Sequence, residues 1–168
     1  MKRLLEWIVY GVVLVGAFTL VSSWQTRDML ETNGAVTITP STLPTLSAGH
    51  AVLGPDASRN TLVYFFAPWC SICRLSIGNL SSVDERDTQV FVVALDYTTV
   101  DEVREFAEAV GLQREVLLGN ADLRALFKVK AFPSYYILDS DFAVISRDMG
   151  YTSELGLRRR LWQESLGK

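Results

Sequence analysis

Cys70 and Cys73 are the residues whose type and spacing most clearly predict chemistry in this chain of 168 residues. They are its only cysteines, and they follow an apolar and aromatic run, Leu62 to Phe66, that is typical of a buried strand. Helix-like sequence comes directly after them, so the pair is expected at a helix N-terminus, where free backbone N–H groups stabilise a thiolate. We expect Cys70 in the exposed first turn and Cys73 turned toward the core.

Thiol–disulfide exchange is the reaction that this arrangement predicts. Cys70, as a thiolate, attacks a disulfide of a partner protein, and Cys73 then attacks Cys70, releases the reduced partner and leaves a Cys70–Cys73 disulfide. A purely structural bridge and a zinc half-site are alternatives, although zinc needs four ligands and only His50 remains to add to the pair. Copper(I) bound by the two thiolates is a further alternative function. We expect no metal or other cofactor in the exchange reaction.

The first 24 residues predict a membrane anchor. Lys2 and Arg3 precede an uncharged stretch from Trp7 to Trp24, which as a helix would extend roughly 27 Å, close to the ~30 Å hydrocarbon core of a bilayer. Basic residues stay on the cytoplasmic side, so residues 4–24 would cross a bacterial inner membrane once and place the catalytic domain in the periplasm. A cleavable signal peptide is the alternative. In either case the domain reaches a compartment where disulfides persist.

The remaining sequence predicts a polar linker over residues 25–42 and one α/β domain over residues 43–168. A parallel strand–helix–strand unit followed by an antiparallel pair predicts a mixed central sheet flanked by helices. Strands are expected within 43–53 and at 62–66, 90–95, 134–138 and 142–147, and helices from about 70, at 99–110, 121–127 and 152–166. The net charge of −3 gives no general attraction to nucleic acid.

Two separated segments of this domain resemble the thioredoxin superfamily. The first is Phe66–Cys73, which contains the CxxC pair, and the second is Phe127–Asp139, which resembles the segment that carries the family's cis-proline. The resemblance spans about residues 43–167 and implies a thioredoxin-like fold, with Pro133 in a cis peptide beside the dithiol. It further implies that Trp69 and Phe132 support substrate binding, together with Ser71 and Ile72, the two residues between the cysteines.

Within the superfamily, the anchor and the short extension resemble the membrane-tethered TlpA/ResA group, including the ScsD-like proteins of copper-sensitivity suppression. This resemblance implies a reductant of specific partner proteins that exchanges electrons with a membrane or periplasmic protein. Tyr64 stands where many thioredoxins carry a buried acid, and Ser76 stands where several ResA-like reductases carry Glu. The family's usual proton acceptors for the second thiol are therefore missing at both positions.

Overall fold

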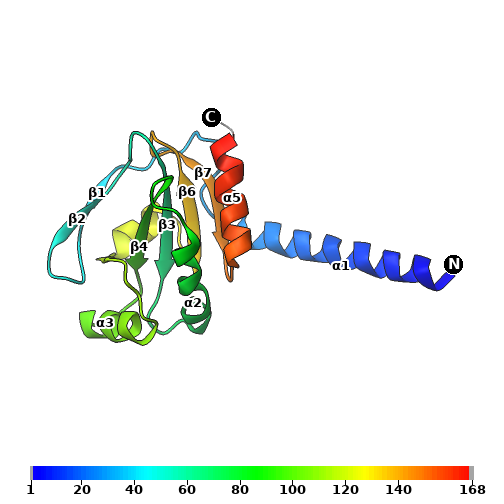
Figure 1. Cartoon of the computed structure of the whole chain (residues 1–168), viewed down its shortest axis with the longest axis horizontal. Coiled ribbons are helices and arrows are strands. Elements are labelled where there is room, and N and C mark those ends of the chain that lie inside the picture. The colour runs from blue at the N-terminus through cyan, green and yellow to red at the C-terminus, as the bar shows by residue number, and fades with distance from the viewer. Residues whose placement is uncertain (1, 167–168) are drawn as a thin grey trace.

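The central element of the structure, a computed structural model, is a five-stranded mixed sheet in the order β5-β4-β3-β6-β7 (Figure 1). The structure describes residues 2–166, without the side chains of residues 2, 4–5, 8, 18–25 and 165–166. The strands of the sheet are β3 Asn60–Phe66, β4 Thr88–Ala94, β5 Val116–Leu118, β6 Ser134–Leu138 and β7 Val144–Met149. β3, β4 and β5 run parallel, while β6 is antiparallel to both β3 and β7.

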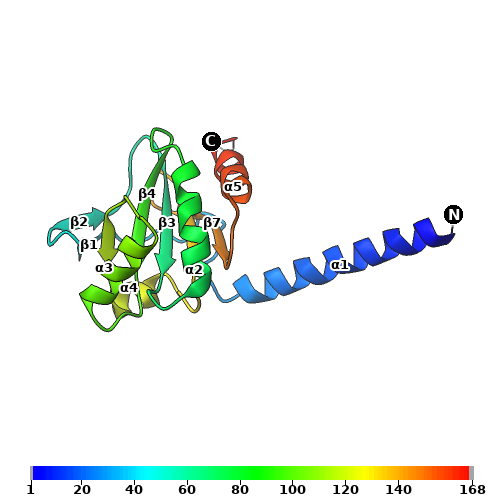
Figure 2. The same cartoon turned by 60° about the horizontal axis from the view of Figure 1, so that its bottom comes forward.

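The helices and a small second sheet surround this sheet. The helices are α1 Lys2–Thr26, α2 Ser71–Ser76, α3 Val100–Ala109, α4 Ala121–Leu126 and α5 Glu154–Leu166, with a 3-10 helix, η1, at Ile77–Ser82. β1 Ser41–Pro44 and β2 His50–Leu53 form a separate antiparallel pair. α1 projects away from the rest of the molecule in both views (Figures 1 and 2).

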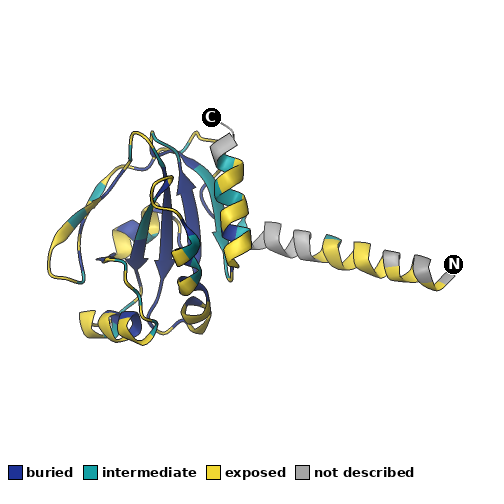
Figure 3. Cartoon of the chain, viewed as in Figure 1, coloured by how far each residue is buried: buried dark blue, intermediate teal, exposed yellow. Residues whose placement is uncertain are grey.

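The sheet separates two apolar clusters, because successive side chains of a strand point to opposite faces. Leu62, Tyr64 and Phe66 of β3 face one cluster, which also contains both cysteines and residues of α3 and α5. Val63 and Phe65 face the other cluster, which contains residues of α4 and of the segment before β1. We call the first the site face and the second the opposite face. Every residue of β3 is buried (Figure 3).

Most of the elements expected from the sequence are present. Thr99 and Asn120 are the N-caps of α3 and α4, a position that both residue types favour. Thr99 Oγ1 accepts from the Glu102 N–H at 3.3 Å, and Asn120 Oδ1 accepts from the Leu123 N–H at 2.9 Å. β6 has the predicted bounds. α2 ends at Ser76 and continues as the 3-10 helix η1, which contains Gly78, a residue type that weakens an α-helix.

One strand was not predicted, and one segment packs differently from its prediction. β5 has only three residues, too few to produce a recognisable period, and it is found through its parallel pairing with β4. Residues 25–42 are predicted as a linker, yet Met29, Leu30 and Ile38 are buried on the opposite face. The Ile38 N–H also donates to the Phe142 carbonyl at 2.9 Å. Apolar residues interspersed in this polar segment thus join it to the domain from about residue 29.

α1 covers the stretch that the sequence predicts as the anchor. In the part of the chain that the structure describes, no helix is both long enough and apolar enough to span a membrane. The side chain of Trp24, which ends the uncharged stretch, lies outside the described residues.

Candidate active site

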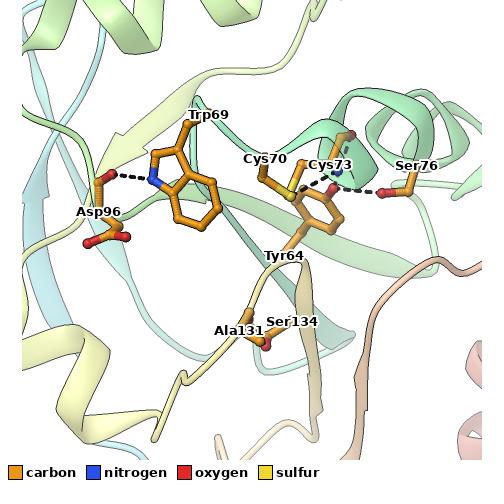
Figure 4. Close-up of a disulfide and its surroundings, with 8 residues drawn as sticks. All are labelled: Tyr64, Trp69, Cys70, Cys73, Ser76, Asp96, Ala131 and Ser134. Atoms are coloured by element: carbon orange, nitrogen blue, oxygen red, sulfur yellow. Dashed lines mark hydrogen bonds between the residues drawn. A yellow bond between two sulfur atoms is a disulfide. The ribbon is translucent and has the colours of Figure 1, made fainter.

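The dithiol lies where the chain leaves β3 and enters α2. Cys70 and Cys73 form a disulfide, with their Cα atoms 5.2 Å apart. Cys70 is the N-cap residue of α2, and its Sγ accepts from the Cys73 backbone N–H at 3.1 Å (Figure 4). This N–H has no partner within the helix, so it is available to stabilise negative charge on the Cys70 sulfur.

Both cysteines are buried in the disulfide form. Cys73 is fully buried, as predicted, but Cys70 is only 5% exposed, whereas the sequence predicts an exposed residue. The difference has a physical cause: the bridge directs the Cys70 sulfur toward Cys73, and both residues lie in the apolar cluster against which Phe132 packs. The residues next to Cys70 remain open, because Trp69, Ser71 and Ile72 are all exposed.

The loop before β6 faces the dithiol. The Phe132–Pro133 peptide is cis, which confirms the conformation expected from the resemblance. The loop is held on both sides of the proline: Ser134 Oγ donates to the Ala131 carbonyl at 2.7 Å, and the Gly150 N–H donates to the Pro133 carbonyl at 2.8 Å. Figure 4 places Ala131 and Ser134 opposite the cysteines.

Trp69 joins this loop to the end of β4. Its Nε1 donates to the Asp96 carbonyl at 3.0 Å, and its ring meets the edge of Phe132 with the ring centroids 5.8 Å apart. The guanidinium of Arg124 lies 5.7 Å from the Phe132 ring centroid and pairs with the Asp96 carboxylate at 3.1 Å. Trp69 is 64% exposed, so it presents an anchored aromatic surface beside Cys70.

Sequence reasoning missed the part that Asp96 and Arg124 play in this arrangement. Asp96 follows the strand predicted at 90–95, where a solvated residue is typical, and no pattern in the sequence singles out Arg124. A signal was available: β3 and β4 are adjacent and parallel, so the residues that follow them meet at one edge of the sheet, as Trp69 and Asp96 do.

A buried hydroxyl pair lies beneath the disulfide. The hydroxyls of Tyr64 and Ser76 are 3.0 Å apart, and Tyr64 also donates to the Cys73 carbonyl at a long 3.5 Å (Figure 4). Burial raises the pKa of Tyr64 far above its ordinary value of 10.0, more than its bond to Ser76 lowers it. The phenol is therefore neutral at physiological pH and is able both to donate and to accept a hydrogen bond.

His50 lies apart from this site. It is exposed in β2, within the separate two-stranded sheet. Among the described residues, no three His, Cys, Asp or Glu side chains are grouped as a metal site would require.

The chain is similar to known thioredoxin-like proteins in sequence and in structure. No family model matches the chain. The chain is 26% identical over 124 residues to the thioredoxin-like protein YneN of Bacillus subtilis, a match that covers 71% of this chain and 73% of that protein. Its structure is similar to that of a DsbF homologue from Corynebacterium diphtheriae, with a TM-score of 0.69, 12% identity, and 81% and 92% of the two chains covered.

A second solved structure gives the same result. A thiol:disulfide interchange protein of the thioredoxin family from Chlorobium tepidum matches with a TM-score of 0.65 and 18% identity, covering 76% of this chain and 94% of that one. The fold of this chain is thus thioredoxin-like, as expected. On this fold, the cis peptide follows Phe132, which packs against the apolar cluster that contains the CxxC disulfide.

Proposed function

We propose that this chain is a thiol-disulfide oxidoreductase that acts on protein partners. The observation that carries the proposal is the Cys70–Cys73 disulfide at the start of α2 on a thioredoxin-like fold. The relatives described as thioredoxin-like or thiol:disulfide interchange proteins support it.

The reaction begins with the reduced pair. The Cys70 thiolate attacks a partner's disulfide, so that a bond forms between Cys70 and one partner sulfur while the other partner sulfur leaves as a thiolate. Cys73 then loses its proton and attacks the Cys70 sulfur. The Cys70–Cys73 bond forms and the bond between Cys70 and the partner breaks. The electron pair of the broken bond leaves with the partner sulfur that was bound to Cys70. The partner is reduced by two electrons and the enzyme is oxidised.

The exposed surface around Cys70 is suited to a polypeptide substrate. Trp69, Ile72 and Leu75 are 64%, 46% and 73% exposed, an unusual amount of apolar side chain for so short a segment. An extended substrate strand beside the Pro133 loop could form backbone hydrogen bonds, and this surface would contact its side chains. Partner proteins with accessible disulfides are the substrate class that we propose.

We further propose a single-pass anchor at residues 4–24, with the catalytic domain in the bacterial periplasm and the N-terminus in the cytoplasm. The uncharged stretch from Trp7 to Trp24, preceded by Lys2 and Arg3, supports this placement. A membrane-impermeant maleimide added to intact cells after mild reduction should then label Cys70. Labelling that requires lysis would contradict the proposed topology.

Reduction of partners is the proposed direction, within a TlpA/ResA-like or ScsD-like group. The resemblance to membrane-tethered reductases supports this direction, and the electron donor would be a membrane or periplasmic redox protein. A redox titration of the full-length chain in glutathione buffers tests it. A potential below that of glutathione is expected for a reductant, and a potential well above it would identify an oxidant.

Replacement of each cysteine tests the oxidoreductase proposal. In insulin reduction, Cys70→Ser should abolish activity, and Cys73→Ser should trap mixed disulfides with partners because the resolving thiol is gone. Ser81→Ala is the control, since Ser81 is exposed in η1, outside the residues expected to contact substrate, and its replacement should leave activity unchanged. Full activity in both cysteine variants would refute the proposal.

Copper(I) binding by the same two thiols is the alternative function predicted from the sequence. A copper(I) titration of the reduced chain separates the two functions. Tight, stoichiometric and thiol-dependent binding, together with no insulin reduction, would replace the oxidoreductase proposal.

A further inference from the structure

Four hydroxyl groups are buried together on the site face, beneath the disulfide. They belong to Tyr64 of β3, Ser76 of α2, Tyr135 of β6 and Thr152, just before α5. Their residues are 0%, 1%, 4% and 7% exposed. Burying a hydroxyl is costly unless it is hydrogen-bonded, so a buried hydroxyl without a partner calls for an explanation. We call these four groups the hydroxyl row.

The first two members of the row adjoin Cys73. Ser76 follows Cys73 by three residues in α2, and both are buried, so they share one face of the helix. The Ser76 hydroxyl is 3.0 Å from that of Tyr64, which in turn reaches the Cys73 carbonyl at 3.5 Å. The inner end of the row is therefore next to the resolving cysteine.

The last member of the row reaches a carboxylate. Thr152 Oγ1 donates to Asp148 Oδ2 at 2.8 Å, and the Thr152 carbonyl is held by the Asn79 side-chain amide at 2.8 Å. The Asp148 side chain is 21% exposed and pairs with Arg160 at 2.8 Å. The outer end of the row is therefore in contact with solvent.

Tyr135 is placed between these two ends. Its ring packs edge-on against Tyr64, with the centroids 5.0 Å apart, and its buried hydroxyl has no hydrogen-bond partner. Burial raises the pKa of Tyr135, while the neighbouring Ser76 and Thr152 hydroxyls lower it in part. Tyr135 contacts Tyr64, the partner of Ser76, and it lines the same small cavity as Thr152 and Asp148. Its unpartnered hydroxyl therefore lies between the two ends of the row, which a small rotation or one water molecule would join.

We propose that the hydroxyl row conducts the proton of Cys73 to solvent at Asp148 during the second step of exchange. This proposal rests on the proposed function. In the mixed disulfide, Cys73 is a thiol and must lose its proton to attack Cys70. The proton passes to the inner end of the row, each hydroxyl accepts one proton and donates another, and a proton leaves to water beside Asp148. The Cys70–Cys73 bond forms, and the partner sulfur departs with the electron pair of the broken bond.

The hydroxyl row would take the place of the carboxylate that many thioredoxins carry at the position of Tyr64, but it would act by relay and not by holding the proton. A hydroxyl can accept and donate at the same time, so it transfers a proton without keeping it. Among the described residues, the titratable and charged groups that face the row are Tyr64, Tyr135, Asp148 of β7 and Arg160 of α5. Arg147 of β7 also lines the cavity beside Thr152, but its guanidinium donates to the Met29 and Leu30 carbonyls. The row members move the proton of Cys73 and form no bond to sulfur.

Reaction of the reduced full-length chain with the aromatic disulfide dithiobis(nitrobenzoate) tests the proposal. Cys70 releases a first coloured thiolate, and Cys73 releases a second when it closes the bridge. These two phases can be followed separately by stopped flow. Tyr135→Phe removes only the unpartnered hydroxyl, and it should slow the second phase roughly tenfold or more while leaving the first unchanged. The slowed phase should also keep rising with pH beyond the wild-type plateau, because hydroxide then removes the proton directly.

Tyr136→Phe is the matched control. Tyr136 is the next residue of β6, faces the opposite side of the sheet, and donates to the Phe127 carbonyl at 2.6 Å. Its substitution should lower the Tm but leave both phases at wild-type rates. Tyr135→Phe should show the reverse pattern, with an unchanged or higher Tm and a slow second phase. A purely structural role for Tyr135 cannot produce that combination.

Ser76→Ala provides a second break in the row and should also slow only the second phase. If both Tyr135→Phe and Ser76→Ala have second phases within twofold of wild type at all pH values, the row does not carry the proton. If the wild-type chain itself shows no fast first phase, the oxidoreductase proposal fails, which is a different outcome from failure of the row.

Discussion

The two faces of the central sheet both bury tyrosine side chains, but the hydroxyl groups of these tyrosines differ in their hydrogen bonding. Tyr135 and Tyr136 are neighbours in β6 and therefore point to opposite faces. On the opposite face, the Tyr136 hydroxyl is paired with a backbone carbonyl, whereas on the site face the Tyr135 hydroxyl has no partner. Leaving a buried hydroxyl unpaired costs on the order of 1–3 kcal/mol. The tyrosine hydroxyl without a hydrogen-bond partner thus lies on the site face, which is also the face that carries the dithiol.

This difference separates residues that stabilise the fold from residues that support the chemistry. The opposite face contains Phe65, Phe127 and Tyr136 in mutual ring contact, with centroids 4.9 to 6.2 Å apart. The site face combines ring contacts with the disulfide and the hydroxyl row. We expect changes on the opposite face to alter stability alone, and changes on the site face to alter the exchange reaction as well.

The largest effects are expected from replacement of Phe65 and Phe66. Both are fully buried neighbours in β3, one on each face. Replacement of either by alanine should lower the free energy of unfolding by about 3–5 kcal/mol in denaturant titrations, because it leaves a large cavity. Only Phe66→Ala should change the rate of thiol exchange, since Phe66 packs against Tyr64 with their centroids 6.4 Å apart. Equal rate changes in the two variants would show that the faces are not functionally distinct.

Trp69→Ala should have an intermediate effect, confined to partner exchange. The side chain is largely exposed, so little stability is lost, but the variant loses the contact with Phe132 and the bond to the Asp96 carbonyl. We expect insulin reduction to slow about tenfold, equivalent to ~1.4 kcal/mol, while reaction with a small aromatic disulfide changes little. Leu155→Ala in α5 is a matched control, because Leu155 is 79% exposed but lies outside this aromatic cluster. Equal losses toward both substrates would argue against a docking role for Trp69.

The smallest effect is expected from charged groups outside both faces. Hydrogen bonds from Arg59 and Ser58 hold the pKa of Asp56 well below its usual range, and Arg86 lowers the pKa of Asp84 to about 2. In the folded state these carboxyls bind protons less tightly than in the unfolded chain. The stability that these carboxyls give the folded state is therefore complete above their ordinary pKa of 3.8, and it is lost as the pH falls toward 2.

Thermal unfolding across this range measures the effect. Asp56→Asn should reduce the loss of Tm between neutral pH and pH 2, because the variant no longer has the titrating carboxyl. Parallel Tm curves for the variant and the wild type would show that the Asp56–Arg59 pair does not contribute to acid sensitivity.

The comparison also shows what could be predicted from the sequence. Strand β3, the CxxC turn and the caps at Thr99 and Asn120 were predictable because local patterns determine them. β5 was not, because its three residues are identified only by their pairing with β4.

The site was predictable for Cys70, Cys73 and the cis peptide at Pro133, but not for the burial of Cys70. The hydroxyl row was only partly visible. Tyr64 and Ser76 stood out as replacements for the family's acids, whereas Tyr135 and Thr152 join them only through tertiary packing. Contacts between residues far apart in the sequence are set by the fold, and no local pattern encodes them.

The difference in reactivity between the two thiols is the most direct test of Cys70 as the attacking residue and Cys73 as the shielded one. The reduced full-length chain is treated briefly with iodoacetamide at neutral pH, and mass spectrometry measures the modification of Cys70 and Cys73 separately. We expect Cys70 to be labelled on the order of tenfold faster than Cys73, because its sulfur accepts a hydrogen bond from the Cys73 N–H at the start of α2 and its neighbours are exposed. Equal labelling of both cysteines, as slow as that of cysteine free in solution, would contradict this expectation.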